Sequence, residues 1–226
     1  YAFRKLGLTV CGDIGCYTLG AAAPLLAIDT AVCMGASISA AMGMEKARGK
    51  DFARRLVAVI GDSTFVHSGI TGLIEMVYNK STATVVIADN STTGMTGHQD
   101  NPATGVTLSG TDTWPLDLEA LVRAVGVQHV RVVDPYDIAA VEAALREECA
   151  REEISVIISR RPCALLKKYK HSNPPLTVDP DACKKCGACL KLGCPALART
   201  KSGTMRIDAS LCTGCAVCAS VCKFGA

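Results

Sequence analysis

Short runs of apolar residues recur along the first 160 positions, and each is followed by a longer stretch of mixed character. The runs are four to six residues long, are rich in valine and isoleucine, and two of them end at a Gly-Asp pair. Apolar runs of this length, bounded by turn-forming residues, are typical of buried β-strands. We predict strands over residues 8–11, 56–60, 84–88, 129–133 and 154–159.

The stretches between these runs carry helical patterns. Residues 35–48 have helical length and small side chains suited to close packing, and residues 137–151 form a strongly amphipathic stretch. We also predict helices over 69–79 and 118–125. Continuous apolar strands that alternate with helices indicate a parallel sheet covered on both faces. The expected fold class is therefore α/β, in which ligands bind at the carboxyl ends of the strands.

Two uncharged stretches, 14–28 and 30–44, are separated only by Asp29. A membrane span needs about 20 predominantly apolar residues. Each stretch is shorter than that, and between them they contain glycine, serine and Pro24. We therefore expect both to be buried core and expect no membrane span.

The composition changes after residue 160. A basic cluster, 167–170, and the sequence Asn173-Pro174-Pro175 mark residues 161–175 as a linker between domains 1–160 and 176–226. The last segment holds about 50 residues, a size at which metals or disulfides usually supply stability.

Cysteine accounts for 13 of the 226 residues, and eight cysteines lie between Cys183 and Cys222. Three are spaced C-x2-C-x2-C with a fourth following, and the same arrangement recurs once further along the chain, so a duplicated half-module is the simplest explanation. In two-cluster ferredoxins three thiolates at this spacing hold one [4Fe–4S] cluster, and the remote cysteine ligates the other cluster. Structural zinc and disulfides fit less well, because a third x2 cysteine has no place in a zinc tetrahedron and nothing indicates an oxidising compartment. The first set is then Cys183, Cys186, Cys189 and Cys222, and the second set is Cys212, Cys215, Cys218 and Cys194.

A second motif follows the predicted strands of the large domain. Gly61-Asp62-Ser63 ends one strand and Asn90 ends the next, and their separation is that of the thiamine diphosphate motif. Asp62, Asn90 and the carbonyl of Thr92 could supply the oxygens that Mg²⁺ prefers, and the diphosphate would meet the N-terminus of the following helix. The pair Gly12-Asp13 also follows a strand, but no asparagine stands at the matching distance.

The segments GDIGCYTLG (12–20), DTAVCMGASIS (29–39), GDSTFVHSGI (61–70) and DNSTTGMTGHQDNPATG (89–105), with the cysteine repeat behind them, resemble the large (alpha) subunit of indolepyruvate:ferredoxin oxidoreductases. The resemblance covers nearly the whole chain. It implies thiamine diphosphate, Mg²⁺ and iron–sulfur clusters. It also implies oxidative decarboxylation of an aryl 2-oxoacid with coenzyme A, giving acyl-CoA, CO2 and reduced ferredoxin.

The resemblance also assigns residues. Gly35, Gly61 and Ser63 match positions that line the diphosphate, and Cys16 matches a cysteine near the cofactor. Met95 stands where pyruvate-specific relatives carry an asparagine, and its apolar side chain suits an aromatic substrate. The alternatives are that Cys16 is a small buried core residue and that Met95 only fills space.

Two histidines lie near these motifs. His67 and His98 could each protonate or hydrogen-bond a reaction intermediate, because a histidine titrates near neutrality. The alternative is that each simply caps or packs. Cys11, Cys33, Cys149 and Cys163 have no assigned chemistry.

The cofactor family uses two halves, and only the diphosphate-binding half is evident in this chain. The half that grips the pyrimidine ring is therefore expected in a missing N-terminal region or a separate chain, with a smaller beta subunit and an acceptor ferredoxin as further partners. Because the chain begins with Tyr1 rather than methionine, we expect a fragment or a naturally split subunit that is inactive alone. A pyruvate or other 2-oxoacid:ferredoxin oxidoreductase subunit, or an electron-transfer subunit without catalysis, remains an alternative.

Charge refines the expected partners. The net charge of +3 is too small to indicate nucleic-acid binding, but the stretch 173–226 carries seven Lys/Arg against three Asp. A basic face could steer an acidic ferredoxin, although a solvated lysine-rich surface is an equal alternative. No secretory signal opens the chain, and we expect a cytoplasmic location.

Overall fold

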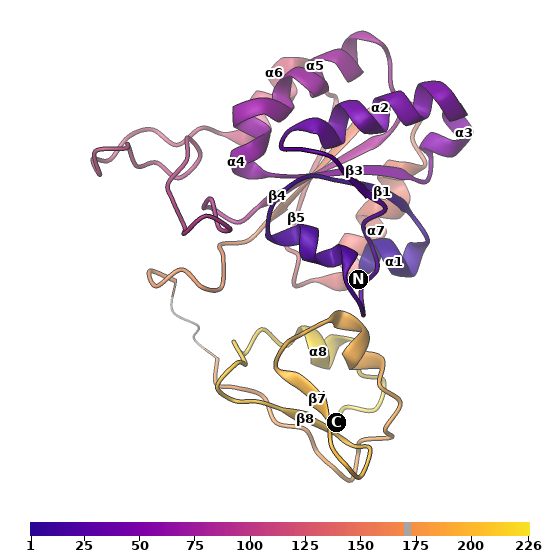
Figure 1. Ribbon diagram of the computed structural model, residues 1–226, viewed down its shortest axis with the longest axis vertical. Coiled ribbons are helices and arrows are strands. Elements are labelled where there is room, and N and C mark those ends of the chain that lie inside the picture. Colours follow the sequence, from indigo (N-terminus) through magenta and orange to yellow (C-terminus); the bar gives the residue numbers. More distant parts are fainter. Residues whose placement is uncertain (170–172) are drawn as a thin grey trace.

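The computed structural model describes residues 1–169 and 173–226, and Figure 1 shows a larger α/β unit beside a smaller unit that holds the C-terminal residues. Residues 170–172 of the predicted linker, with the last lysine of its basic cluster, lie outside the described residues.

The larger unit is built on a parallel sheet of six strands in the order β2-β1-β3-β4-β6-β5. Each of the five predicted strands is confirmed within two residues, and β2 is too short to leave a pattern in the sequence. The register pairs Gly61 with Ala88, so the residues that follow β3 and β4 emerge side by side. The strands are β1 (Thr9–Gly12), β2 (Thr30–Ala31), β3 (Leu56–Gly61), β4 (Thr84–Asp89), β5 (His129–Val133) and β6 (Ser155–Arg160).

Helices cover both faces of this sheet, as the pattern predicts. Alternate residues of β3 face opposite sides: Ala58 and Ile60 join the core under α2, α5 and α6, whereas Val57 and Val59 join the core under α1 and α7. This alternation follows from the two-residue period of a strand. The helices are α1 (Ala2–Leu6), α2 (Ala36–Arg48), α3 (Lys50–Ala53), α5 (Ile70–Tyr78), α6 (Leu118–Val125) and α7 (Ile138–Cys149).

One helix begins earlier than its sequence pattern. The predicted helix over 69–79 is α5, but a short turn α4 (Asp62–Thr64) and a π-helical turn η2 (Phe65–Gly69) precede it directly. The added turns contain small and polar residues at positions that apolar periodicity does not reveal. Their start at Asp62 places this residue at the junction of β3 and a helical segment.

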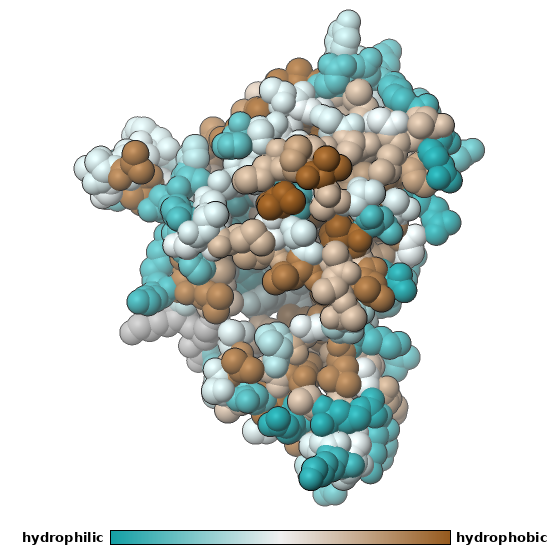
Figure 2. Space-filling view, in the orientation of Figure 1, coloured by the Kyte–Doolittle hydropathy of each residue, from teal (hydrophilic) through white to brown (hydrophobic). Residues whose placement is uncertain are grey.

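The expectation that the uncharged stretches are buried core is wrong for most of residues 14–26 and 31–34. Leu19 is 72% exposed and Val32 is 73% exposed, and these segments form a 3-10 helix η1 (Cys16–Ala21) and irregular loops. A lack of charge does not bury a segment that has neither strand nor helix periodicity. Figure 2 shows that apolar side chains are exposed on the face of the large unit that carries these N-terminal elements.

The smaller unit contains little regular structure. Two antiparallel strands, β7 (Leu197–Arg199) and β8 (Met205–Ile207), stand with η3 (Ala188–Leu192) and α8 (Val217–Ser220). Ala196 and Met205 are buried there, which is little apolar core for a unit of this size. Over the described parts of the chain, no helix has both the length and the apolar character needed to cross a membrane.

Candidate functional site

A cavity of about 230 Å³ opens at the carboxyl ends of β1, β3 and β4. This is the edge at which ligands bind in open parallel sheets. It contains most of the residues that the sequence motifs single out. Its lining consists of Ile14, Gly15, Cys16, Tyr17, Met34, Gly61, Asp62, Ser63, Thr64, Ala88, Asn90, Thr92, Thr93, Gly94, Met95 and Thr96.

Asp62 is the buried acid of this cavity. Its side chain belongs to a residue only 2% exposed, and Oδ1 accepts a hydrogen bond from the Ser63 amide at 2.8 Å. Among the described residues, Oδ2 has no hydrogen-bonding partner. Burial raises the pKa of Asp62 to about 6, and the negative charge of Asp89 adds to the rise. A buried carboxylate oxygen without a partner is costly in a protein alone but suits a hard cation such as Mg²⁺.

Asn90 supplies a second oxygen beside it. Asn90 follows β4, its Oδ1 accepts the Thr92 amide at 3.2 Å, and its own carbonyl accepts the Cys163 amide at 2.9 Å. Thr92 is 3% exposed, so its carbonyl lies in the same sheltered turn. The residues present therefore fit a divalent cation held by Asp62, Asn90 and Thr92 at adjacent strand ends.

Asn101 belongs to this neighbourhood and was not singled out by its sequence. It is 8% exposed, its Oδ1 accepts the Ala103 amide at 2.9 Å, and its Nδ2 meets no hydrogen-bonding partner in the part of the chain that the structure describes. Its side chain opposes the rise in the pKa of Asp62, which places the amide next to that carboxyl group. Because the loop from Asn90 folds back to bring Asn101 here, spacing along the chain gives no signal for it.

Tyr17 forms one wall of the cavity and was also missed. Its hydroxyl accepts a hydrogen bond from the Gly61 amide at 3.1 Å, and burial raises its pKa far above the ordinary value. The ring lies so close to Gly15 that a Cβ there would stand 2.5 Å from it. A glycine at position 15 is therefore required for the ring to reach β3.

The neighbouring Cys16 is exposed, so the alternative that it is a buried core residue is wrong. Its Sγ would lie 3.4 Å from a Cβ built on Gly94, and both residues line the cavity. Met95 also lines it and is 54% exposed. Ser63 Oγ accepts a hydrogen bond from Thr93 Oγ1 at 3.0 Å, which joins the two loops across the cavity.

Three predicted site residues do not line this cavity. Gly35 directly precedes α2 as its N-cap residue, with φ +86°, and its amide donates to Asp13 Oδ1 at 2.9 Å. His67 is exposed on η2. His98 is exposed on the loop after β4, with Nε2 3.8 Å from Cys163 Sγ.

Asp13 explains the other Gly-Asp pair. The residue is fully buried, and its carboxylate accepts hydrogen bonds from the amides of Gly35 and Ser37. It therefore binds the first amides of α2, and its role in the fold is structural.

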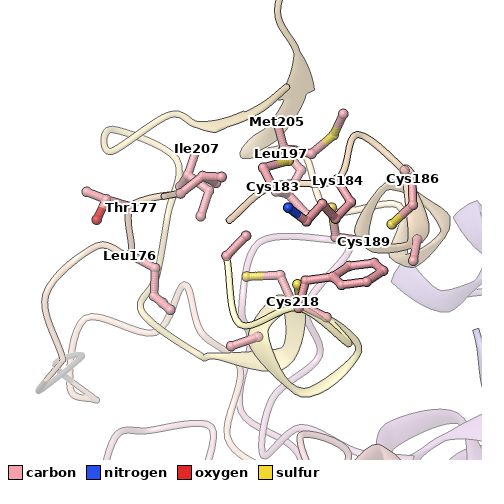
Figure 3. Close-up of a pocket in the computed structure, with 17 residues that line it drawn as sticks. Leu176, Thr177, Cys183, Lys184, Cys186, Cys189, Leu197, Met205, Ile207 and Cys218 are labelled. Carbon is pink, nitrogen blue, oxygen red and sulfur yellow. The ribbon is translucent and has the colours of Figure 1, made fainter. Parts of the chain in front are cut away.

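The eight clustered cysteines surround two adjacent cavities of the smaller unit. Cys183, Cys186, Cys189 and Cys222 line one, which Figure 3 shows between the first half of the repeat and β8. Cys194, Cys212, Cys215 and Cys218 line the other. Cys218 lines both cavities, so the two are neighbours.

The pKa values of two thiols reflect the same two groups of cysteines. Burial raises the pKa of Cys189, and the nearby Cys186 and Cys222 add to the rise. Burial likewise raises the pKa of Cys218, with Cys215 and Cys194 adding to it. Within the described residues, no group of three or more His, Cys, Asp or Glu side chains is placed to hold a single metal ion.

Comparison with known proteins gives two family matches. Residues 13–159 match the family described as "Thiamine pyrophosphate enzyme, C-terminal TPP binding domain". Residues 205–226 match the family described as "4Fe-4S binding domain". The first match covers the sheet and its cavity, and the second covers the second half of the cysteine repeat.

Curated relatives extend over nearly the whole chain. It is 41% identical over 214 residues to the indolepyruvate oxidoreductase subunit IorA of Archaeoglobus fulgidus, covering 93% of this chain and 34% of the relative. It is 40% identical to the subunit of the same name from Pyrococcus horikoshii, covering 95% and 36%. The chain thus spans about a third of the length of these relatives.

Among solved structures, the fold is similar to that of a 2-oxoglutarate:ferredoxin oxidoreductase from Magnetococcus marinus, solved with 2-oxoglutarate, coenzyme A and succinyl-CoA bound. The TM-score is 0.62 at 19% identity, over 84% of this chain and 70% of the other. At this identity the similarity concerns the fold alone.

Proposed function

The chain belongs to the thiamine pyrophosphate enzyme family, and from this premise we propose that it is the diphosphate-binding and electron-carrying part of an aryl 2-oxoacid:ferredoxin oxidoreductase. The reaction is the oxidative decarboxylation of a substrate such as indolepyruvate, with coenzyme A as co-substrate and ferredoxin as the electron acceptor. The curated relatives named as IorA subunits support this assignment at about 40% identity.

The observation that carries the proposal is that Asp62 Oδ2, in the cavity at the sheet edge, lacks a hydrogen-bonding partner among the described residues. Asp62, Asn90 and the Thr92 carbonyl would hold Mg²⁺, and Gly61 and Ser63 would face the diphosphate. Bound thiamine diphosphate supplies an electron sink that allows a 2-oxoacid to lose CO2. The Tyr17 hydroxyl fixes the Gly61 amide, and the Thr93–Ser63 hydrogen bond holds the two loops that would flank the diphosphate.

The eight cysteines would hold two [4Fe–4S] clusters. The first set surrounds one cavity and the second set the next, so the clusters would be adjacent and could pass electrons singly. The surplus of basic residues over the stretch 173–226 would favour an acidic acceptor.

Substrate choice would depend on the loop after β4. Met95 lines the cavity and offers a flexible apolar contact for an aromatic ring. Cys16 would lie near the cofactor, on the opposite loop. His67 and His98 remain candidates for hydrogen bonding an intermediate, and Gly35 for lining the diphosphate, although none of the three lines the cavity.

The remaining parts of the enzyme would lie outside this chain, which spans about a third of its curated relatives. A pyrimidine-binding half would cover the exposed apolar side chains of Leu19, Val32 and Met34, of which Met34 lines the cavity. A smaller beta subunit would complete the complex.

The test is substrate-dependent ferredoxin reduction by the complete protein under anaerobic conditions. Indolepyruvate is expected to give a higher kcat/KM than pyruvate or 2-oxoglutarate. Met95→Asn should narrow that preference by about tenfold, because one apolar contact contributes about 1–3 kcal/mol to discrimination. Equal activity on all three acids would contradict the aryl assignment, and ferredoxin reduction by none of them would contradict the proposed reaction.

A further inference from the structure

The turn that follows β5 is where the larger unit meets the cysteine-rich unit. Asp134 Oδ1 accepts the Tyr136 amide at 2.9 Å, which fixes the turn, and Asp137 then caps α7. Tyr136 lines three separate cavities, and each has residues of the smaller unit on its other side. In Figure 1 this junction lies between the sheet and α8.

Arg161 covers the same tyrosine from the end of β6. Its guanidinium carbon lies 3.9 Å from the centre of the Tyr136 ring, and its Nη1 forms an ion pair with Asp134. Stacking of an arginine on a tyrosine ring contributes a cation–π attraction. The turn, the ring and the arginine therefore form one packed group at the junction.

The segment that carries Arg161 also borders the proposed cation site. The Arg161 amide donates to the Asp89 carbonyl at 2.9 Å, and the Cys163 amide donates to the Asn90 carbonyl at 2.9 Å. Arg161 and Cys163 line a cleft of about 400 Å³ whose opposite wall includes Gly214 and Cys215. This cleft thus lies between the segment bonded to Asn90 and the second cysteine set.

The two cysteine sets differ in their relation to this junction. The cavity of the second set is lined in part by Pro135, Tyr136 and Ile138 of the larger unit. The cavity of the first set is lined only by residues between Leu176 and Ala226. Of the first set, within the described residues, Cys222 alone borders a cavity at the junction.

We propose that Tyr136 and Arg161 dock the second cysteine set against the carboxyl edge of the sheet, so that its cluster is the entry point for electrons and the cluster of the first set is the exit. This inference rests on the proposed function. Each 2-oxoacid and coenzyme A would give acyl-CoA, CO2, one proton and two electrons. Each electron would reduce the second-set cluster, then the first-set cluster with reoxidation of the second, and would leave to an acceptor of the ferredoxin class.

Mediated redox titration of the complete protein, followed by EPR, tests the assignment. Cys215→Ser and Cys186→Ser each alter the EPR signal of one cluster and so identify it. With the signals assigned in this way, Arg161→Ala in the protein with all eight cysteines intact is expected to move the midpoint potential of the cluster identified by Cys215→Ser to more negative values, because a nearby positive charge favours the reduced cluster. The midpoint potential of the other cluster should not change, and Arg161→Lys should restore the original potential of the cluster identified by Cys215→Ser.

Arg54→Ala is the matched control, because Arg54 also pairs with a carboxylate, Glu152, at the surface. If Arg161→Ala shifts the midpoint potential of the first-set cluster, or of neither cluster, the inference is overturned. Dithionite performs the reduction in this titration, so the result does not depend on turnover of any 2-oxoacid. If the proposed reaction is wrong, substrate fails to reduce either cluster while the Arg161 shift persists.

Docking itself has a separate readout. Hydrogen exchange of residues 212–216 is expected to speed up in Tyr136→Ala, because the ring that covers this loop is lost. Tyr136→Phe keeps the ring and should exchange like the unmodified protein. Unchanged exchange in Tyr136→Ala would contradict a docking role.

Discussion

Asp62 combines near-complete burial with a carboxylate oxygen that lacks a hydrogen-bonding partner within residues 1–169 and 173–226. Its pKa of about 6 lies above the ordinary value of 3.8, so the folded chain binds this proton more tightly than the unfolded chain does. Without metal, the stability linked to this group is fully present below about pH 4 and is lost as the pH rises through about 6. A bound cation would offset the cost of the charge.

Asp62→Asn is therefore expected to increase the metal-free free energy of unfolding at pH 7 by about 1–3 kcal/mol, while abolishing stabilisation by Mg²⁺ and thiamine diphosphate. In the unmodified chain, cofactor affinity should fall about tenfold per pH unit below about pH 6, because the proton and cation compete for one oxygen. Thermal unfolding measures the free energy of unfolding, and calorimetric titration measures the cofactor affinity, each at several pH values. A variant that still gains stability from the cofactor would exclude Asp62 as a ligand.

Asn101 is expected to orient Asp62 rather than to bind the cation itself. Asn101→Ala should weaken binding of Mg²⁺ with thiamine diphosphate by about 10-fold to 100-fold, the range for residues that support a metal ligand. Asn101→Asp should raise the pH at which binding is lost, because another carboxylate disfavours ionisation of Asp62. Calorimetric titration measures the affinity, with Asn79→Ala at the end of α5 as control. Unchanged affinity in both Asn101 variants would remove this residue from the site.

At the scale of elements, the secondary structure of the larger unit could be predicted from the sequence more fully than that of the smaller unit. The strands and helices of the larger unit could be predicted because burial imposes a two-residue or 3.6-residue period on the sequence. The smaller unit has short strands and little apolar core, so its organisation could be predicted only from the spacing of its cysteines. The start of the helical segment at Asp62 was not predictable, because polar residues that line a cavity break the apolar period.

Cys215→Ala is expected to lower iron content from about eight to about four atoms per chain, because it removes one ligand of one [4Fe–4S] cluster. Cys33→Ala, which changes an exposed cysteine outside the repeat, should leave the iron content unchanged. Anaerobic purification with iron and sulfide analysis provides the measurement. Full iron content in Cys215→Ala would show that this cysteine is not a ligand.

At the scale of the molecule, apolar side chains are exposed on η1 and on the segment that follows β2, and one of them, Met34, lines the cavity. Leu19, Val32 and Met34 are 72%, 73% and 49% exposed, and large exposed apolar patches mark interaction sites. The chain also spans only about a third of its curated relatives. The proposed pyrimidine-binding half would cover these exposed side chains.

The 226-residue chain alone is therefore expected not to turn over a 2-oxoacid, even when loaded with clusters, Mg²⁺ and thiamine diphosphate. Addition of the pyrimidine-binding half should restore ferredoxin reduction, and Val32→Glu should weaken that restoration by burying a charge in the contact. Anaerobic assays with and without the added half measure this. Robust turnover by the isolated chain would refute the two-half arrangement.

The sequence alone determined the α/β class, the five main strands, the spacing of Asp62 and Asn90, and the division of eight cysteines into two predicted sets. These features are local periods and fixed spacings, which a linear pattern carries directly. Only the tertiary structure brought Asn101 and Tyr17 to the cavity, exposed the uncharged segments, and set Tyr136 and Arg161 at the junction of the two units. Such contacts join residues from different loops, whose paths depend on the packing of the whole sheet.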